Sequence, residues 1–329
     1  MGILKKIISL FLRISISVIL IILLFKFNKI DLHILFGNIK SADKRLLLLA
    51  FSISFFSYVL CLYRWQMLLK AANIQLPLKR VIVSFCGGIF FSLFLPSTIG
   101  GDLTRSVDLG VHTKRPREVI ATVLLDRLSG YIGLVIVASL SLFLGWGLVK
   151  NDSKVLISVG IITALLVVIL AVLFNNFLFS KVNKILDSPK AGRVRESIKN
   201  LHEEMHIFRH NKKVMLNNIF LSLLVQALGP ITFYITSLSL GMHKEIIYFF
   251  IFLPIIGAIT LLPISIGGLG VRENMTVLFF AKAGINQNSA VAISLLNFLF
   301  ILVYGAIGGL IYVLTIHHRR LQRNQSPPL

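Results

Sequence analysis

The sequence has little charge for its length. Only 14% of its 329 residues are Asp, Glu, Lys or Arg, whereas 56% are hydrophobic, and the mean hydropathy is +0.86. A water-soluble protein needs more surface charge than this. Several apolar stretches are also longer than the roughly 18 residues that can cross a bilayer as a helix. The composition therefore argues against a soluble enzyme and predicts an all-α polytopic membrane protein.

Cysteine and acidic residues are scarce as well. Cys61 and Cys86, the only two cysteines, fall inside apolar stretches, so neither a disulfide framework nor a thiolate zinc site is expected. No P-loop is present, and no cofactor is expected. The 13 acidic residues face 34 basic ones, for a net charge of +21. The basic residues cluster in short loops beside apolar stretches, which is typical of membrane orientation and lipid-headgroup attraction rather than of nucleic-acid binding.

The chain is predicted to form a single transmembrane domain, 1–329, with halves 1–179 and 215–316. Residues 30–36 suit a helix lying in the membrane interface, 180–214 a cytoplasmic amphipathic segment, and 317–329 a basic tail. The first apolar stretch resembles a signal sequence but is too long and lacks a cleavage site, so a retained helix is predicted. Six stretches are long enough to cross the bilayer: 7–27, 46–69, 119–149, 155–179, 215–240 and 288–316.

Two further apolar stretches, 81–118 and 246–287, are each interrupted by a segment rich in Pro and Gly. With both termini in the cytoplasm, the inner side carries 21 Lys and Arg residues and the outer side 10, as the positive-inside rule favours, although the basic loop 26–45 fits poorly. Six crossings then make the first interrupted stretch begin and end inside, and the second outside. Each must enter and return, as a re-entrant hairpin or as two short spans, and the two point in opposite directions across the cell membrane.

The two interruptions resemble each other. Residues 96–105 read PSTIGGDLTR and residues 263–272 read PISIGGLGVR, so five of ten positions are identical at an offset of 167. Paired broken helices in oppositely oriented halves indicate the inverted repeat of a transporter and its midplane site. Pro96 and Pro263 would stop the incoming helix. Glycines would allow the reversal and close approach of a ligand: Gly100, Gly101, Gly267, Gly268 and Gly270.

A phosphate or carboxylate site is expected where each outgoing helix begins. Its free N–H groups and positive dipole end would be joined by Arg105 or Arg272 in the first turn. Irregular backbone at membrane depth is tolerated where it is buried in protein or lines an aqueous cavity. The alternative for a single break is a surface loop with a snorkelling arginine, but the matched pair favours a site.

Other charged residues lie near these segments or within spans. Inserting a charged side chain at the centre of the bilayer costs on the order of 3 kcal/mol. Asp102 would cap the helix after the first break or pair with Arg105, and Glu273 follows Arg272 directly. Asp126 and Arg127 would line the site or lie at the cytoplasmic interface. Arg64, followed by Trp65, would be an interfacial anchor or a site residue.

One motif favours an enzyme instead. His202, Glu203 and His206 match the zinc-binding pattern H-E-x-x-H, with His210 one turn further along. The surrounding segment is polar and basic and offers no buried setting or obvious downstream carboxylate ligand. A solvated helix is the preferred interpretation, with neither a metal site nor catalysis expected.

Together the motifs resemble the lysylphosphatidylglycerol synthase transmembrane region, also called the flippase-like family, over roughly residues 7–316. The resemblance rests on Tyr63-Arg64-Trp65, Leu95-Pro96 through Gly100-Gly101-Asp102-Leu103-x-Arg105, Asp126-Arg127-x-x-Gly130 and Gly267-Gly268-Leu269-Gly270-Val271-Arg272-Glu273. In bacterial members with a synthase domain, this region is understood to move aminoacylated phosphatidylglycerol between leaflets. Because this chain ends soon after its last predicted span, no synthesis of such a lipid is expected.

The resemblance implies a lipid translocase whose centre is the two Gly-Gly hairpins with Asp102, Arg105, Arg272 and Glu273. The substrate would be an anionic or aminoacylated phospholipid, or a polyprenyl-phosphate-linked lipid. The alternative is a non-transporting membrane scaffold that binds such a lipid beside a lipid- or glycan-modifying enzyme. Membrane lipids are the expected partners in either case, and the oligomeric state stays open.

Overall fold

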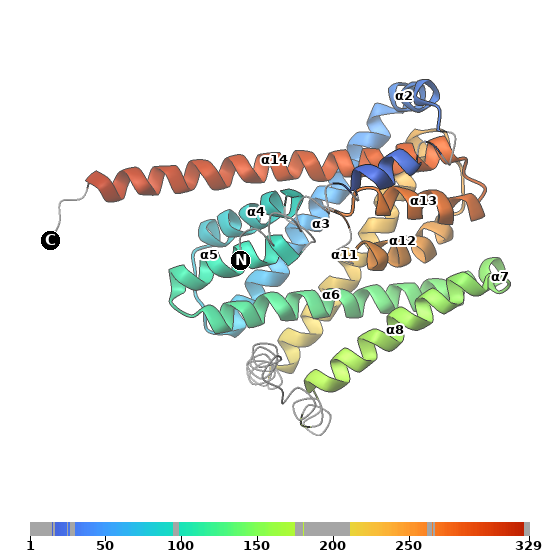
Figure 1. Ribbon diagram of the computed structural model, residues 1–329. Helices are drawn as coiled ribbons and strands as arrows, with labels where there is room; N and C mark the ends of the chain where they lie inside the picture. Colours follow the sequence, from blue (N-terminus) through green and yellow to red (C-terminus); the bar gives the residue numbers. More distant parts are fainter. Residues whose placement is uncertain are drawn as a thin grey trace. The chain divides into compact units, whose positions relative to one another are not determined.

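The computed structural model describes residues 15, 17–24, 26, 30–94, 99–174, 180, 211–261, 265 and 267–325, and these ranges contain helices and no strand. This confirms the predicted all-α fold (Figure 1). The labelled helices are α2 (Leu32–Ser41), α3 (Lys44–Ala71), α4 (Leu78–Phe94), α5 (Ile99–Thr113), α6 (Pro116–Leu144), α7 (Trp146–Val149), α8 (Ser153–Phe174), α11 (Lys212–Ser239), α12 (Ile246–Thr260), α13 (Val271–Lys282) and α14 (Gln287–Gln325).

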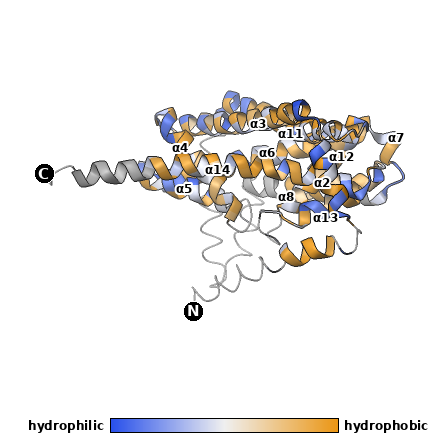
Figure 2. Cartoon of the chain, turned by 90° about the horizontal axis from the view of Figure 1, so that it is seen from above, coloured by the Kyte–Doolittle hydropathy of each residue, from blue (hydrophilic) through white to orange (hydrophobic). Residues whose placement is uncertain are grey.

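Four helices of the described part are long and apolar enough to cross a membrane: α3, α6, α11 and the Gln287–Thr315 part of α14. Large apolar side chains are exposed along them, as lipid solvation requires. Figure 2 colours the helices by the hydropathy of their residues. Phe143 and Leu144, for example, are 79% and 75% exposed. The chain is thus a polytopic membrane protein. The expected total of six crossings stays a prediction, because α8 and α12 carry only shorter apolar runs, Val155–Val168 and Ile246–Thr260.

A short helix occupies the region predicted to lie in the membrane interface. α2 begins after Asp31, whose Oδ1 accepts hydrogen bonds from the backbone N–H groups of His33 and Ile34 at 2.7 and 3.3 Å. Its exposed side chains include Leu32, Ile34 and Phe36. Most of the predicted amphipathic segment 180–214 lies outside the described residues.

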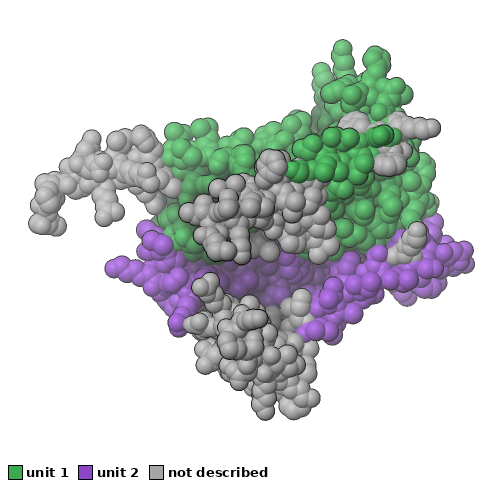
Figure 3. Space-filling view, viewed as in Figure 1, with its two compact units in different colours: residues 1–56, 77–108, 229–329 green, residues 57–76, 109–228 purple. Residues whose placement is uncertain are grey.

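The chain divides into two compact units (Figure 3). Unit 1 comprises 1–56, 77–108 and 229–329, and unit 2 comprises 57–76 and 109–228. Each unit takes segments from both predicted halves of the chain. Both Gly-Gly sequences, 100–101 and 267–268, belong to unit 1.

The first interrupted stretch of the sequence forms a helical hairpin of α4 and α5. The two helices touch through glycine, because a Cβ added to Gly101 would collide with the carbonyl oxygen of Gly88. α4 has 17 residues and α5 has 15, so their lengths are about 25 and 22 Å. Both are shorter than the roughly 30 Å hydrocarbon core of a bilayer.

The second interrupted stretch forms a hairpin of α12 and α13. Aromatic pairs join the two helices: the ring centroids of Phe249 and Phe280 lie 5.1 Å apart, and those of Phe252 and Phe279 lie 5.5 Å apart. α12 has 15 residues and α13 has 12, or about 22 and 18 Å. Helices this short are more consistent with a re-entrant hairpin than with two helices that each cross the whole bilayer. The opposite orientation of the two hairpins in the bilayer stays a prediction.

α14 packs along α4 in unit 1, and the contact runs through glycines of both helices (Figure 1). A Cβ on Gly87 would lie 2.5 Å from the ring of Tyr312, and one on Gly308 would lie 2.9 Å from the carbonyl oxygen of Cys86. A Cβ on Gly305 would likewise collide with the Leu93 side chain, and one on Gly309 with the Phe90 ring. This α4–α14 seam (Gly87, Gly305, Gly308 and Gly309 with the groups they touch) leaves no room for added atoms.

Unit 2 is built around α6, which packs against α7 and α8. A Cβ on Gly133 of α6 would lie 2.9 Å from the backbone of Ser222, so α11 also approaches α6 closely. Trp65, from the part of α3 in this unit, is fully buried, and its indole N–H donates to Thr122 Oγ1 of α6 at 3.2 Å.

Candidate functional site

Arg105 lies in the interior of the first hairpin. It is 4% exposed, and its Nε and Nη2 lie 3.1 and 3.0 Å from Asp102 Oδ1. Its guanidinium carbon is 5.8 Å from the ring centroid of Phe85 on α4, within cation–π distance. Of the two predicted roles of Asp102, the structure therefore shows the pairing with Arg105. Phe85 was not predicted.

The predicted helix start at the first break is wrong. α5 begins at Ile99, so Gly100 and Gly101 lie in its first turn and Arg105 falls in its second turn. The glycine pair does not form the reversal there. Gly101 is instead required for the close approach of α5 to Gly88. Pro96 lies outside the described residues.

The second break does use its glycines to turn the chain. Gly267, Gly268 and Gly270 have φ values of 59°, 77° and 81°, a region that side-chain-bearing residues rarely adopt. α13 begins immediately afterwards at Val271, so Arg272 lies in its first turn as predicted. Gly270 is also close to another helix, since a Cβ there would lie 2.7 Å from that of Leu20. Pro263 lies outside the described residues.

Arg272 is held by the carboxylate that follows it. Its Nε and Nη2 donate to Glu273 Oε1 at 3.0 and 2.7 Å, and the same oxygen accepts from the hydroxyl of Ser294 on α14 at 3.2 Å. Glu273 Oε2 accepts from the backbone N–H of Gly270 at 2.6 Å, which caps α13. With all these bonds Glu273 is suited to positioning Arg272 rather than to binding a ligand.

An aromatic ring lies beneath this second arginine too. The guanidinium carbon of Arg272 is 4.7 Å from the ring centroid of Phe298 on α14. Arg105 and Arg272 thus share one arrangement, in which a carboxylate of the same helix and a ring of another fix the guanidinium. Neither ring nor Ser294 was predicted, because an isolated Phe or Ser in an apolar helix gives no signal.

The second break lies against the helix that leads into the first. A Cβ on Gly267 would be 3.9 Å from the carbonyl oxygen of Leu93, one residue before the end of α4. Both sequences therefore belong to one region of unit 1. This proximity agrees with the predicted common site, whose residues nevertheless remain a prediction as ligand contacts.

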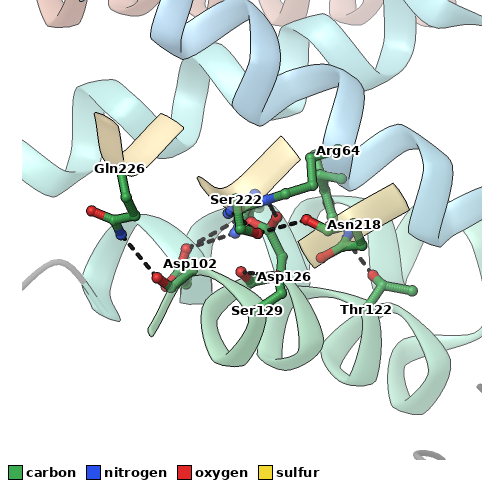
Figure 4. A network of polar contacts seen from close by, with 11 residues as sticks. Arg64, Asp102, Thr122, Asp126, Ser129, Asn218, Ser222 and Gln226 are labelled. Carbon is green, nitrogen blue, oxygen red and sulfur yellow. Dashed lines mark hydrogen bonds and ion pairs between the residues drawn. The ribbon is translucent and has the colours of Figure 1, made fainter. Parts of the chain in front are cut away.

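Arg64 of unit 2 is the centre of a further set of polar contacts, drawn in Figure 4. Arg64 of α3 donates through Nε to Asp126 Oδ1 of α6 at 2.6 Å and through Nη1 to Ser222 Oγ of α11 at 2.8 Å. Asp126 is the eleventh residue of α6, about 15 Å along its axis. The pair is 5% and 3% exposed, so it is enclosed by protein rather than by lipid. Arg127 is half-buried beside it in sequence.

The interpretation of Arg64 and Trp65 as an interfacial anchor is wrong. An anchor presents its indole to the headgroups, whereas Trp65 is 0% exposed. Residues that complete this cluster were not predicted. They include Ser222, Gln226, whose Nε2 donates to the Gly130 carbonyl at 2.9 Å, and the buried Asn218.

The zinc-binding alternative falls on residues 202–206 and 210, which lie outside the described residues. Within the described ranges no group of three or more His, Cys, Asp or Glu side chains is arranged to hold a metal ion.

The chain is similar in sequence to a family of membrane regions and to several membrane proteins of archaea. The profile of the family described as "Lysylphosphatidylglycerol synthase TM region" matches residues 10–309. A "UPF0104 membrane protein PH1989" of Pyrococcus horikoshii is 25% identical over 280 residues, covering 78% of this chain and 82% of that protein. Two proteins of Methanothermobacter thermautotrophicus named "UPF0104 membrane protein" are each 25% identical, over 281 and 267 residues. They cover 77% and 73% of this chain and 80% and 74% of their own lengths.

Proposed function

The chain belongs to the family of the lysylphosphatidylglycerol synthase transmembrane region, and from that premise we propose that it is a membrane lipid translocase. It would carry a lipid with a phosphate headgroup between the leaflets of the cell membrane, with both termini in the cytoplasm. The transported headgroup would bind in unit 1 at Arg105 and Arg272, while the acyl chains stay in the bilayer. The protein would act as a transporter and not as an enzyme.

One observation carries the proposal: two arginines of unit 1, each near a Gly-Gly sequence of a short hairpin, are held in the same way. Each is fixed by a carboxylate and by an aromatic ring. Guanidinium groups fixed in this way are suited to bind phosphate through paired hydrogen bonds. Arg272 also directly follows a turn of three glycines, from which a purely structural arginine would gain nothing.

Arg272 has capacity left for a ligand. Glu273 takes up Nε and Nη2, and Nη1 has no hydrogen-bond partner among the described residues. The side chain is 13% exposed, so a ligand can approach this nitrogen. The N-terminus of α13 lies beside it and contributes the positive end of its dipole.

The test is translocation of fluorescent phospholipids in proteoliposomes. Arg272→Gln removes the charge at similar size, and we expect a loss of at least tenfold in the protein-dependent rate. Arg115→Gln is the matched control, because Arg115 forms a partly exposed pair with Glu118 in unit 2. Equal rates in the two variants would refute the site. If the folded wild type bound lipid without moving it, the protein would be a lipid-binding scaffold instead.

A further inference from the structure

The end of the first hairpin away from its break contains an ion pair with unused hydrogen-bonding atoms. Arg80, the third residue of α4, donates through Nη2 to Asp108 Oδ1 of α5 at 2.6 Å. Arg80 Nε and Nη1 and Asp108 Oδ2 are buried and have no partner in the part of the chain that the structure describes. Arg80 is only 5% exposed. A buried guanidinium with two unpaired donors is costly, because those N–H groups have lost water and gained no partner.

A third helix lies close to this pair. Tyr312 of α14 is near enough to both side chains to interact with their charges, and its ring covers Gly87 of α4. Tyr312 is half-buried, so its hydroxyl can take part in binding. α4, α5 and α14 thus bring a basic, an acidic and a hydroxyl side chain into one region of unit 1.

We propose that Arg80, Asp108 and Tyr312 form a second binding station for the headgroup of a phospholipid. The inference rests on the proposed function and extends it to a place where the headgroup binds before or after it reaches Arg105. The ligand must supply oxygens to Arg80 Nε and Nη1 and a hydrogen to Asp108 Oδ2. A phosphate that carries a neighbouring hydroxyl or ammonium group meets both requirements, whereas a phosphodiester without a donor meets only the first.

The position of the station along α5 fits this role. Asp108 follows Arg105 by three residues, so both lie on one face of the helix about 5 Å apart along its axis. Ser84 of α4 contacts this part of α5, since its hydroxyl donates to the Arg105 carbonyl at 3.4 Å. The three unpaired atoms are buried in this conformation. The headgroup would therefore bind when α4 and α5 separate at the end of the hairpin away from the break.

Neighbouring residues supply a close control. Lys79 carries the same charge as Arg80 but is exposed. Binding of dihexanoyl phosphatidylglycerol would be measured by titration calorimetry on the full chain in neutral detergent, in an Arg272→Gln background that weakens binding at the second break. We expect Arg80→Gln to weaken binding about tenfold or more and Lys79→Gln less than about threefold. Equal effects, or none for Arg80→Gln, would overturn the station.

A second variant is needed because Arg80→Gln also leaves Asp108 without its ion-pair partner. Asp108→Asn keeps the shape but replaces one carboxylate oxygen by a donor. The wild type should prefer phosphatidylglycerol over phosphatidylmethanol, whose headgroup has no hydroxyl, and Asp108→Asn should remove this preference. A preference that persists in Asp108→Asn would show that Asp108 does not read the headgroup donor.

Inorganic phosphate distinguishes the source of the ligand. If it binds at Arg80 as tightly as the lipid does, the ligand is a free anion and the headgroup assignment is wrong. Translocation assays separate this inference from the proposed function. Transport without Arg80-dependent binding would refute only the second binding station. Arg80-dependent binding without any transport would refute only the translocase proposal.

Discussion

Glu273 Oε1 accepts two hydrogen bonds from Arg272, its neighbour in sequence, while Glu273 Oε2 holds the backbone N–H of Gly270. One carboxylate therefore fixes both the start of α13 and the orientation of the arginine proposed to bind phosphate. Ser294 adds a fourth bond from α14. Glu273 therefore sets the orientation of Arg272.

We predict that Glu273→Ala lowers the free energy of unfolding by on the order of 3 kcal/mol. The variant leaves the largely buried charge of Arg272 without a partner and the start of α13 without a cap. Lipid translocation should fall at the same time. Thermal unfolding in detergent checks the first effect and the proteoliposome assay the second. Glu245→Ala is the control, since Glu245 is exposed at the start of α12 and caps nothing with its side chain. Equal unfolding temperatures of the two variants would contradict the role of Glu273.

We predict that Gly101→Ala separates α4 from α5. The new methyl group would collide with the backbone of Gly88 and lie 2.9 Å from Ser92 Cβ, and backbone atoms cannot move aside cheaply. The variant should unfold at lower temperature by the equivalent of about 1–3 kcal/mol. Gly257→Ala in α12 meets no atom within 4 Å and should be neutral or stabilising. A neutral Gly101→Ala would mean that the helices are not in contact there.

We predict that the Arg64–Asp126 pair behaves as a coupled buried unit. Asp126→Asn leaves Arg64 uncompensated and should cost about 3–5 kcal/mol, whereas the double variant Arg64→Met, Asp126→Leu should cost less than Asp126→Asn alone. Glu118→Gln, which breaks a partly exposed pair, should change stability by at most about 1 kcal/mol. Additive effects of Arg64→Met and Asp126→Leu in a double-mutant cycle would contradict the coupling.

We predict that Trp65 is inaccessible to lipid. Trp146→Phe leaves Trp65 as the sole tryptophan, and its fluorescence in bilayers of brominated phosphatidylcholine should be quenched little, since it is 0% exposed. Trp65→Phe leaves Trp146, which is 54% exposed and should be quenched more strongly. Strong quenching of Trp65 would restore its interpretation as an interfacial anchor.

The helices and their interruptions could be predicted because they follow from local properties. Long apolar runs form α3, α6, α11 and α14, and Pro and Gly mark the two hairpins. The order Arg272-Glu273 after three glycines also indicated a charged helix start. Such signals require only the residues within one turn or one span.

What could not be predicted depends on which residues meet across helices. The similar decapeptides at 96–105 and 263–272 differ in structure: Gly101 packs on Gly88 inside α5, whereas its counterpart Gly268 lies in a turn with a φ of 77°. The burial of Arg64 depends on Ser222, which lies 158 positions away. Asp108 gave one usable signal, its spacing of three from Arg105, but its partner Arg80 resembled any other basic residue at a helix start.

The α4–α14 seam also constrains how relatives of this protein can diverge. Outward-facing residues such as Phe143 can change among apolar types without contact with another helix. Gly87 and Tyr312, in contrast, are complementary in size, as are Gly309 and Phe90. A larger residue on either helix can persist only with a smaller one opposite. In an alignment of relatives these positions should therefore vary in pairs, and their covariation would record the contact even where overall identity is as low as 25%.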